Sequence, residues 1–426
     1  MNRRVPAAFA PAVTGVLVLT ACGSPGAGGS GGAAADGVTT LRFVAADYGS
    51  NGRNPSRAYW DDLVGAFERV NPKIKVDVQV FDWNDISARL ATMVQNKQYP
   101  DIVEGPGYAS FSAAGLLYTT DQELNQSVQS DLIPALARAG DQGGALYGVP
   151  FVSSSRAFLI NNALWKKAGL PMNGNQAVAP KTWAGVQRAA TRMKAAGVSI
   201  PLGLPLGSEE AQAESFMWEM NNGGGYVDAS GKWVINSAAN VATFKQLGKW
   251  VDAGLTEKDP GSVKRTDLYA DFASGKVGML NGMPIQLDDI KKNNLDVTWA
   301  SLPTAQAGGT PQTLGVGDWI YGFTSGGHAA QIKAFLDFAF QKRWQVRFDE
   351  EYDLLPVTED AVRQVESDVP ELVPFLKALP NAQFVPVSAP EWDVVNAQVK
   401  TRIGGALKDP QGVLTTLQTA AVSAGR

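Results

Sequence analysis

The segment from residue 41 to residue 104 alternates short apolar runs with amphipathic stretches, and this pattern limits the chain to few folds. Residues 41–46 predict an apolar strand, and residues 57–70 place apolar side chains at helical spacing. Residues 74–80 alternate apolar and polar side chains, which is typical of a strand with one buried face. A second helix and a strand at 100–104 follow. The strand–helix–strand order predicts an α/β protein with a largely parallel sheet, in which ligands bind at the carboxyl ends of the strands.

The later part of the chain continues this mixture of helices and strands. Thr182 predicts the cap of a helix that starts at Trp183, and residues 268–281 predict a helix, a turn and an apolar strand. Residues 329–348 predict one long helix, and the chain after Asp393 is expected to be mostly helical. Four tryptophans fall on the apolar faces of predicted helices, and we expect them in the core: Trp60, Trp183, Trp250 and Trp344.

Charge and metal-binding residues exclude several classes of protein. The chain has 37 basic and 41 acidic residues and no lysine or arginine cluster, which argues against a nucleic-acid partner. Its one cysteine and one histidine, Cys22 and His328, exclude an intrachain disulfide framework, a cysteine-based zinc site and a histidine-rich metal site. The sequence therefore predicts no metal site and no cofactor.

The N-terminus has the parts of a bacterial export signal. A positive start, Met1 to Arg4, precedes an apolar run that is too short to span a bilayer comfortably. The run ends in Leu19-Thr20-Ala21-Cys22, which resembles the lipobox of bacterial lipoproteins. The resemblance implies a signal peptide at residues 1–21 and a lipid on the thiol of Cys22. Residues 22–40 are rich in glycine and predict a flexible linker between the anchor and the folded body.

Several motifs of the body follow the order found in one family. QNKQYPDIV at residues 95–103, ALYGVPFVSSSRAFLINN at 145–162 and FASGKVGMLNG at 272–282 resemble segments of the extracytoplasmic solute-binding proteins of ABC transporters. The segments LWKKAGL and PKTW, and the later Leu354 to Val357, continue the resemblance in order. The best match within the family is the sugar-binding branch that includes the maltose-binding proteins.

This resemblance implies a periplasmic-binding-protein-like fold, in which hinge segments join two α/β lobes and a ligand cleft lies between them. Because such a chain crosses between lobes more than once, we expect lobe one at 41–151 and 296–341, and lobe two at 152–295 and 342–426. The resemblance further implies that hinge closure traps a carbohydrate ligand. The expected partners are that carbohydrate and the membrane permease subunits of an ABC transporter, and the expected oligomeric state is a monomer.

The resemblance places the ligand beside the loops that follow the strands. Sugars bind to flat aromatic faces combined with planar hydrogen-bonding groups, and these loops carry both. In the first lobe the candidate ligand-binding residues are Tyr48, Asn51, Asp82, Trp83, Asn84, Glu104 and Tyr108. Near the hinge, in the second lobe and in the later segments they are Ser154, Arg156, Glu209, Trp218, Asn281, Met283, Asp318, Trp319 and Trp392.

Structural roles stay open for some of these candidates. Asp82 and Asn84 also fit helix caps, Arg156 also fits a bridge between the lobes, and Trp218 also fits a helix core. The segment from Asn281 to Pro284 lacks the aromatic residue expected there in a maltose-binding protein, which argues against a long maltodextrin.

Two other functions would explain part of these sequence features, namely a secreted glycosidase and a surface-adhesion lipoprotein. A secreted glycosidase would use similar aromatic residues, but it needs two carboxylates that flank a cleft at a defined separation. The adjacent acidic pairs, such as Asp61-Asp62 and Glu350-Glu351, fit solvated helix faces instead. A surface-adhesion lipoprotein would not need the hinge-like segments. The sequence therefore predicts a transport binding protein and not an enzyme.

Overall fold

The computed structural model describes residues 37–49, 55–83, 85–105 and 107–425. The predicted signal peptide, the lipidation residue Cys22 and most of the predicted linker lie outside these residues, as do the candidates Asn51 and Asn84. The first strand begins at Thr39, inside the predicted linker. Among the helices within the described ranges, none is both long enough and apolar enough to cross a membrane.

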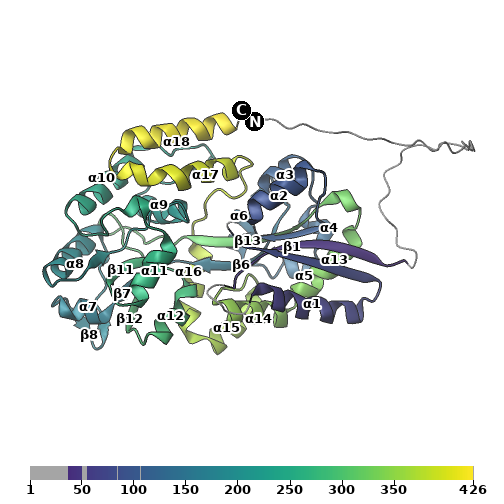
Figure 1. Ribbon diagram of the computed structural model, residues 1–426, viewed down its shortest axis with the longest axis horizontal. Helices are drawn as coiled ribbons and strands as arrows, with labels where there is room; N and C mark the ends of the chain where they lie inside the picture. Colours follow the sequence, from purple (N-terminus) through teal and green to yellow (C-terminus); the bar gives the residue numbers. More distant parts are fainter. Residues whose placement is uncertain (1–36, 50–54, 84, 106, 426) are drawn as a thin grey trace, which may run out of the picture.

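The first of two main sheets has five strands in the order β2-β1-β3-β13-β6 (Figure 1). β1 pairs in parallel with β2 and β3, as predicted, whereas β13 is antiparallel to β3 and β6. The strands of this sheet are β1 (Thr39–Ala46), β2 (Ile74–Phe81), β3 (Ile102–Gly105), β6 (Val149–Ser155) and β13 (Gly315–Gly322).

The second main sheet has four strands in the order β10-β11-β7-β12. β10 is parallel to β11, and β7 is antiparallel to its neighbours β11 and β12. These strands are β7 (Ala157–Asn161), β10 (Ile200–Leu202), β11 (Val277–Gly282) and β12 (Val297–Ala300). Two short hairpins are formed by β4 (Asp141–Gln142) with β5 (Ala145–Leu146), and by β8 (Met172–Asn173) with β9 (Gln176–Ala177).

Helices cover both sheets and form the rest of each lobe (Figure 1). Those of the first lobe are α1 (Ser56–Val70), α2 (Ile86–Gln95), α3 (Ala109–Ala113), α4 (Thr120–Glu123), α5 (Gln126–Gln129), α6 (Pro134–Ala139), α13 (Ala329–Ala339) and α14 (Lys342–Tyr352). Those of the second lobe are α7 (Asn162–Lys167), α8 (Trp183–Ala195), α9 (Ala211–Met220), α10 (Ala238–Asp252), α11 (Arg265–Ala273), α12 (Leu287–Lys292), α17 (Trp392–Arg402) and α18 (Pro410–Ala424). The segment between α14 and α17 holds α15 (Glu359–Asp368) and α16 (Val373–Ala378). Short 3-10 turns are η1 (Pro260–Ser262), η2 (Pro284–Gln286), η3 (Thr324–Gly326), η4 (Pro370–Leu372), η5 (Leu379–Asn381) and η6 (Ile403–Leu407).

Local sequence explains most of these elements. The hydroxyl of Thr182 accepts a hydrogen bond from the backbone N–H of Gly185, which caps α8 as predicted. In α1, four side chains at helical spacing are fully buried against the sheet, namely Tyr59, Trp60, Leu63 and Phe67. The single helix predicted over residues 329–348 is wrong, because the chain turns at Phe340 and Gln341 and divides into α13 and α14.

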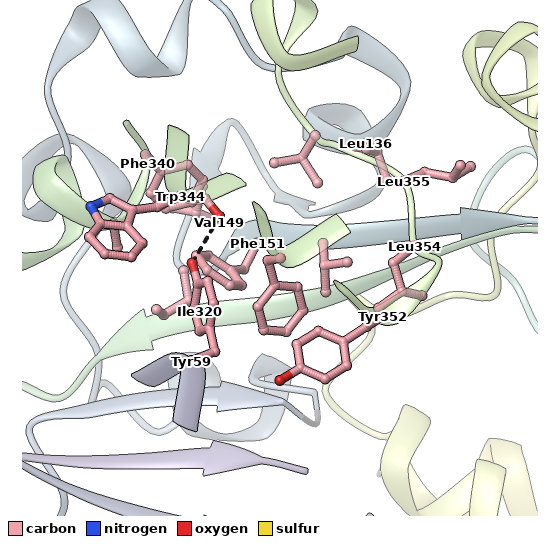
Figure 2. Packing of buried hydrophobic residues seen from close by; sticks show 14 of the residues in the cluster. Tyr59, Leu136, Val149, Phe151, Ile320, Phe340, Trp344, Tyr352, Leu354 and Leu355 are labelled. Atoms are coloured by element: carbon pink, nitrogen blue, oxygen red, sulfur yellow. Dashed lines mark hydrogen bonds between the residues drawn. The ribbon is translucent and has the colours of Figure 1, made fainter. Parts of the chain in front are cut away.

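The turn between α13 and α14 lets α14 pack against α1 and the first sheet (Figure 2). The Tyr59 hydroxyl donates a hydrogen bond of 3.0 Å to the backbone oxygen of Trp344. Phe151 on β6 lies with its ring centroid 5.4 Å from that of Phe348 on α14. The predicted lobe boundaries therefore need correction at three places: β6 stays in the first sheet as far as Ser155, β12 pairs within the second sheet, and α14 belongs to the first lobe.

The two-lobe α/β fold predicted from the sequence is confirmed. All four tryptophans predicted to lie in the core are buried, and Trp60 and Trp250 are at most 1% exposed. One residue alone, Arg156, separates β6 of the first sheet from β7 of the second. The chain therefore passes directly from one sheet to the other at this point, and side chains around Arg156 are held between the two lobes.

Candidate functional site

At the edge of the first sheet that faces the second lobe, three of the predicted residues meet. The Tyr48 hydroxyl lies 2.6 Å from Oε1 of Glu104 and 3.0 Å from Oδ2 of Asp318. Tyr48 follows the end of β1, Glu104 lies at the end of β3 and Asp318 lies within β13, and the sheet brings these strands side by side. The hydroxyl has one proton to donate, so both contacts are hydrogen bonds only when one of the carboxyl groups is protonated.

Burial explains how a carboxyl group can stay protonated here. The Glu104 side chain is fully buried, and this burial raises its pKa to about 8, although hydrogen bonds from Tyr48 and Ala46 act in the opposite direction. Burial also raises the pKa of Asp318 to about 7. The charges of Glu210 and Arg156 act on Asp318 as well, which places it beside the polar groups of the second lobe.

Aromatic rings surround this carboxyl pair on the first-lobe side. The ring of Tyr48 lies edge-on to Trp83 and Phe348, at centroid distances of 5.5 and 5.0 Å, and 6.0 Å from Tyr352. The side chain of Trp83 is 37% exposed. Trp83 therefore offers a ligand an accessible aromatic face next to hydrogen-bonding groups.

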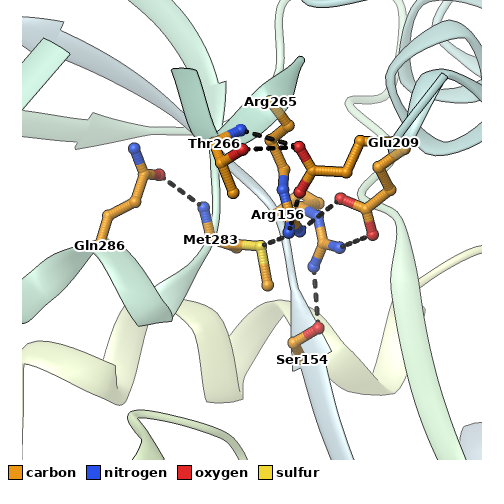
Figure 3. A network of polar contacts seen from close by, with 8 residues as sticks. Ser154, Arg156, Glu209, Arg265, Thr266, Met283 and Gln286 are labelled. Atoms are coloured by element: carbon orange, nitrogen blue, oxygen red, sulfur yellow. Dashed lines mark hydrogen bonds and ion pairs between the residues drawn. The ribbon is translucent and has the colours of Figure 1, made fainter. Parts of the chain in front are cut away.

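A second polar group lies at the junction of the lobes (Figure 3). Arg156 donates to the Ser154 hydroxyl at 2.8 Å and pairs with Glu210 at 3.3 Å. Arg265, the first residue of α11, pairs with Glu210 at 2.7 Å and with Glu209 at 2.9 Å. Two guanidinium groups thus face two carboxylates in one chain of ion pairs.

The positive charges in this ion-pair chain stabilise the ionised form of its carboxylates. Burial alone would raise the pKa of Glu210, but the positive charges of Arg265 and Arg156 outweigh burial and hold it below its usual value. Arg265 also lies 3.3 Å from the sulfur of Met283, a predicted site residue, and Glu209 accepts from the backbone and hydroxyl of Thr266. The two guanidinium groups and two carboxylates of the ion-pair chain consequently balance one another's charge.

The match to a family model, described as the bacterial extracellular solute-binding protein, extends over residues 51–346. The chain belongs to this family. The resemblance found in the sequence is therefore confirmed.

Individual relatives of this solute-binding protein agree with the family. A binding protein of Brucella abortus is 26% identical over 364 residues, which cover 83% of this chain and 85% of that protein. The sn-glycerol-3-phosphate-binding periplasmic protein of Brucella melitensis is 28% identical, and the match covers 71% of this chain and 74% of that protein. The crystal structure of a cyclic α-maltosyl-1,6-maltose binding protein from Arthrobacter globiformis has the same fold, with a TM-score of 0.72, 17% identity and coverage of 91% and 98%. These relatives are named as binding proteins and not as enzymes.

Four predicted aromatic residues of the solute-binding protein lie in cores and not at an open surface. Tyr108 is fully buried and donates to the backbone oxygen of Gly140. Trp319 is 2% exposed and packs against Tyr108. Trp218 donates to Glu214, and Trp392 stacks on Trp233. In this conformation none of the four rings presents a free face to a ligand.

Two further predicted residues, Asp82 and Asn281, differ in their exposure. Asp82 is exposed beside Trp83. Asn281 is 2% exposed and donates a hydrogen bond to Glu214, so it is buried inside the second lobe. Sequence reasoning missed Arg265, which connects Glu209 and Glu210, and its position at the start of α11 gave no distinguishing motif.

Acidification is expected to stabilise the protein. A carboxyl group whose pKa is raised in the folded state favours folding below its unfolded-state pKa, and this contribution is lost as the pH rises through the folded-state value. For Glu104 this contribution to stability is lost over a pH range from about 4.5 to about 8. We expect the free energy of unfolding to fall between pH 5 and pH 8. Glu104→Gln should make this slope shallower by up to about 1.4 kcal/mol per pH unit.

Urea unfolding at several pH values measures this slope for both proteins. Asp61→Asn, at an exposed carboxylate on α1, serves as the control and should leave the slope unchanged. Equal slopes for the Glu104→Gln variant and the original protein would contradict the assignment of a buried, protonated carboxyl group.

Proposed function

We propose that this solute-binding protein captures a carbohydrate, either a mono- to oligosaccharide or a related polyol, outside the membrane and delivers it to the permease of an ABC importer. The observation that carries the proposal is that two polar walls, Tyr48–Glu104–Asp318 and Arg156–Glu210–Arg265, lie at the junction of the lobes. They are near enough for the charges of Glu210 and Arg156 to act on Asp318. Carboxylate and guanidinium groups are the planar partners that sugar hydroxyls use, and Trp83 supplies an aromatic face beside them.

The balance of charge at the junction favours an uncharged ligand. Arg156 and Arg265 are both already paired with carboxylates, so no unpaired guanidinium is offered by these two residues. A phosphate group would have to displace Glu209 or Glu210 from these charge-assisted hydrogen bonds. We therefore favour a sugar or polyol over a phosphorylated ligand, although one relative is named for binding sn-glycerol-3-phosphate.

Hinge closure fits the way in which the chain connects the lobes. Arg156 alone links β6 to β7, and Gly107 of the first lobe lies next to Asp393 on α17 of the second. A Cβ atom placed on Gly107 would lie 3.0 Å from Oδ1 of Asp393. We propose that a rotation about Arg156 separates these surfaces to admit the ligand and that closure restores their contact.

The lipid anchor remains a prediction from the sequence. We propose that the thiol of Cys22 carries the lipid and that residues 23–38 let the folded body reach its permease.

A saccharide screen tests the proposed ligand class. We expect at least one mono- or oligosaccharide to raise the melting temperature of the protein, because a ligand that binds only the folded state stabilises it. Trp83→Ala should weaken the affinity for that saccharide by about 1–2 kcal/mol, which is about 5- to 30-fold in Kd. Isothermal titration calorimetry measures the change.

Val70→Ala is the control for this experiment, because Val70 is 65% exposed at the end of α1 and should not alter binding. A broad panel without any saccharide that shifts the melting temperature would refute the ligand class. A Kd unchanged in Trp83→Ala would remove Trp83 from the site.

A further inference from the structure

A hollow of about 1000 Å³ lies between the lobes, lined by residues outside both polar walls of the proposed cleft. The first lobe contributes α6 and β4, and the second lobe contributes the turn at Val227 and Gly231. The connecting segments 310–312 and 380–389 complete the lining. We call this hollow the rear groove.

The rear groove and the ion-pair chain lie on opposite faces of the ribbon formed by β6 and β13. The side chain of Ser154 faces Arg156, whereas the next residue, Ser155, points the other way and donates to the backbone oxygen of Phe375. Gly315 pairs with Ser155, and a Cβ atom on Gly315 would lie 2.5 Å from the ring of Phe384. Paired residues of neighbouring strands share a face of the ribbon. Phe384 and the rear groove therefore lie on the Ser155 face, opposite the ion-pair chain.

One wall of the rear groove is fixed by hydrogen bonds. Gln142 on β4 accepts from the Ser112 hydroxyl and donates to the backbone oxygen of Ser388 at 3.0 Å. These bonds tie the first lobe to the connecting segment 380–389. A ligand would therefore meet a preformed surface, which lowers the entropy cost of binding.

Other polar side chains of the rear groove are free to bind a ligand. Within the described part of the chain, the side-chain amides of Gln312 and Gln383 make no hydrogen bond and Arg138 makes no ion pair. Gln383 and Arg138 are exposed and Gln312 is half-buried. The half-buried ring of Phe384 stands among them. Amides, a guanidinium and an aromatic ring are the groups that bind sugar hydroxyls and the apolar patches of a sugar ring.

We propose that the rear groove is a second saccharide site, separate from the cleft between the two polar walls. Its volume is at the upper end for small-molecule sites, so it accommodates a mono- to trisaccharide. Its lining mixes prolines and polar groups instead of forming a continuous apolar patch, which favours a hydrated, uncharged ligand over a lipid. This site goes beyond the proposed transport function and does not depend on it.

Titration calorimetry of the full chain tests the second site. Glucose, maltose, maltotriose and glycerol are the probes, each titrated to millimolar concentration. For at least one saccharide we expect two binding events. The double variant Gln312→Ala/Gln383→Ala should weaken one event at least 10-fold and leave the other unchanged. Trp83→Ala should have the reverse pattern. Gln411→Ala, at an exposed amide on α18, should change neither event.

Each outcome of this titration separates the two sites. The rear groove would be overturned if no probe gave a binding event that the double variant weakens at least 10-fold. An event lost in the double variant and retained in Trp83→Ala would support the groove even if the cleft binds none of the probes. Arg138→Ala provides an independent variant, because its exposed side chain can be removed without disturbing the core.

Discussion

Trp319→Ala is expected to lower the free energy of unfolding by about 3–5 kcal/mol, because it removes a buried indole and leaves a cavity. Trp319 is 2% exposed, and its ring occupies the space beside Gly140, where a Cβ atom would lie 2.6 Å from it. The ring also packs against Tyr108 at a centroid distance of 5.3 Å. The loss should appear as a large decrease in the urea midpoint with little change in the slope of the transition.

Trp83→Ala is the matched comparison for Trp319→Ala. The two variants delete the same side chain, but Trp83 is 37% exposed at the proposed cleft. We expect Trp83→Ala to change stability by less than about 1 kcal/mol and to act mainly on ligand affinity. If Trp319→Ala instead left stability intact and weakened saccharide binding, Trp319 would be a stacking residue that becomes accessible in another conformation of the protein.

Arg265→Ala is the second variant with a large expected effect. It removes the guanidinium that pairs with both Glu209 and Glu210, so two largely buried carboxylates lose a partner. Breaking such a pair from one side costs about 3 kcal/mol or more. We expect the free energy of unfolding to fall by about that amount and saccharide binding to be lost, because Glu209 and Glu210 no longer hold their positions.

Arg347→Ala is the control for Arg265→Ala. Arg347 pairs with Asp62 at 2.8 Å, but these side chains are 39% and 64% exposed. An exposed ion pair contributes little, so we expect a change below about 1 kcal/mol. Denaturant unfolding and calorimetry on both variants measure the difference. Equal, small effects in the two variants would show that the ion-pair chain at the lobe junction does not hold the second lobe's wall in place.

The local elements could be predicted from the sequence because their signals are local. The alternation in residues 74–80 and the helical spacing in 57–70 depend on neighbouring side chains, and both elements are confirmed within one residue at each end. Thr182 capped its helix as predicted. The division of residues 329–348 was missed because the apolar spacing continues across the turn into α14, and only packing against α1 shows that the direction changes.

The site was less predictable, because burial and pairing depend on distant residues. Trp392 follows a loop in the sequence, yet its ring stacks on Trp233 at 6.3 Å and is 5% exposed. Arg265 carries no motif, and its partner Glu209 lies 56 residues earlier. The loop positions Tyr48 and Glu104 were accessible to sequence reasoning because the ends of parallel strands meet at one edge of a sheet.

The position of β13 has a consequence for how the chain folds. This strand lies between β3 and β6, yet it follows them by more than 150 residues and comes after all four strands of the second sheet. The sheet of the first lobe therefore stays incomplete during synthesis until residue 322 has emerged, even though its first strand begins at Thr39. Contacts between residues so far apart in sequence slow folding. A chain that folds late remains extended for longer, which suits a protein whose N-terminus predicts export across a membrane.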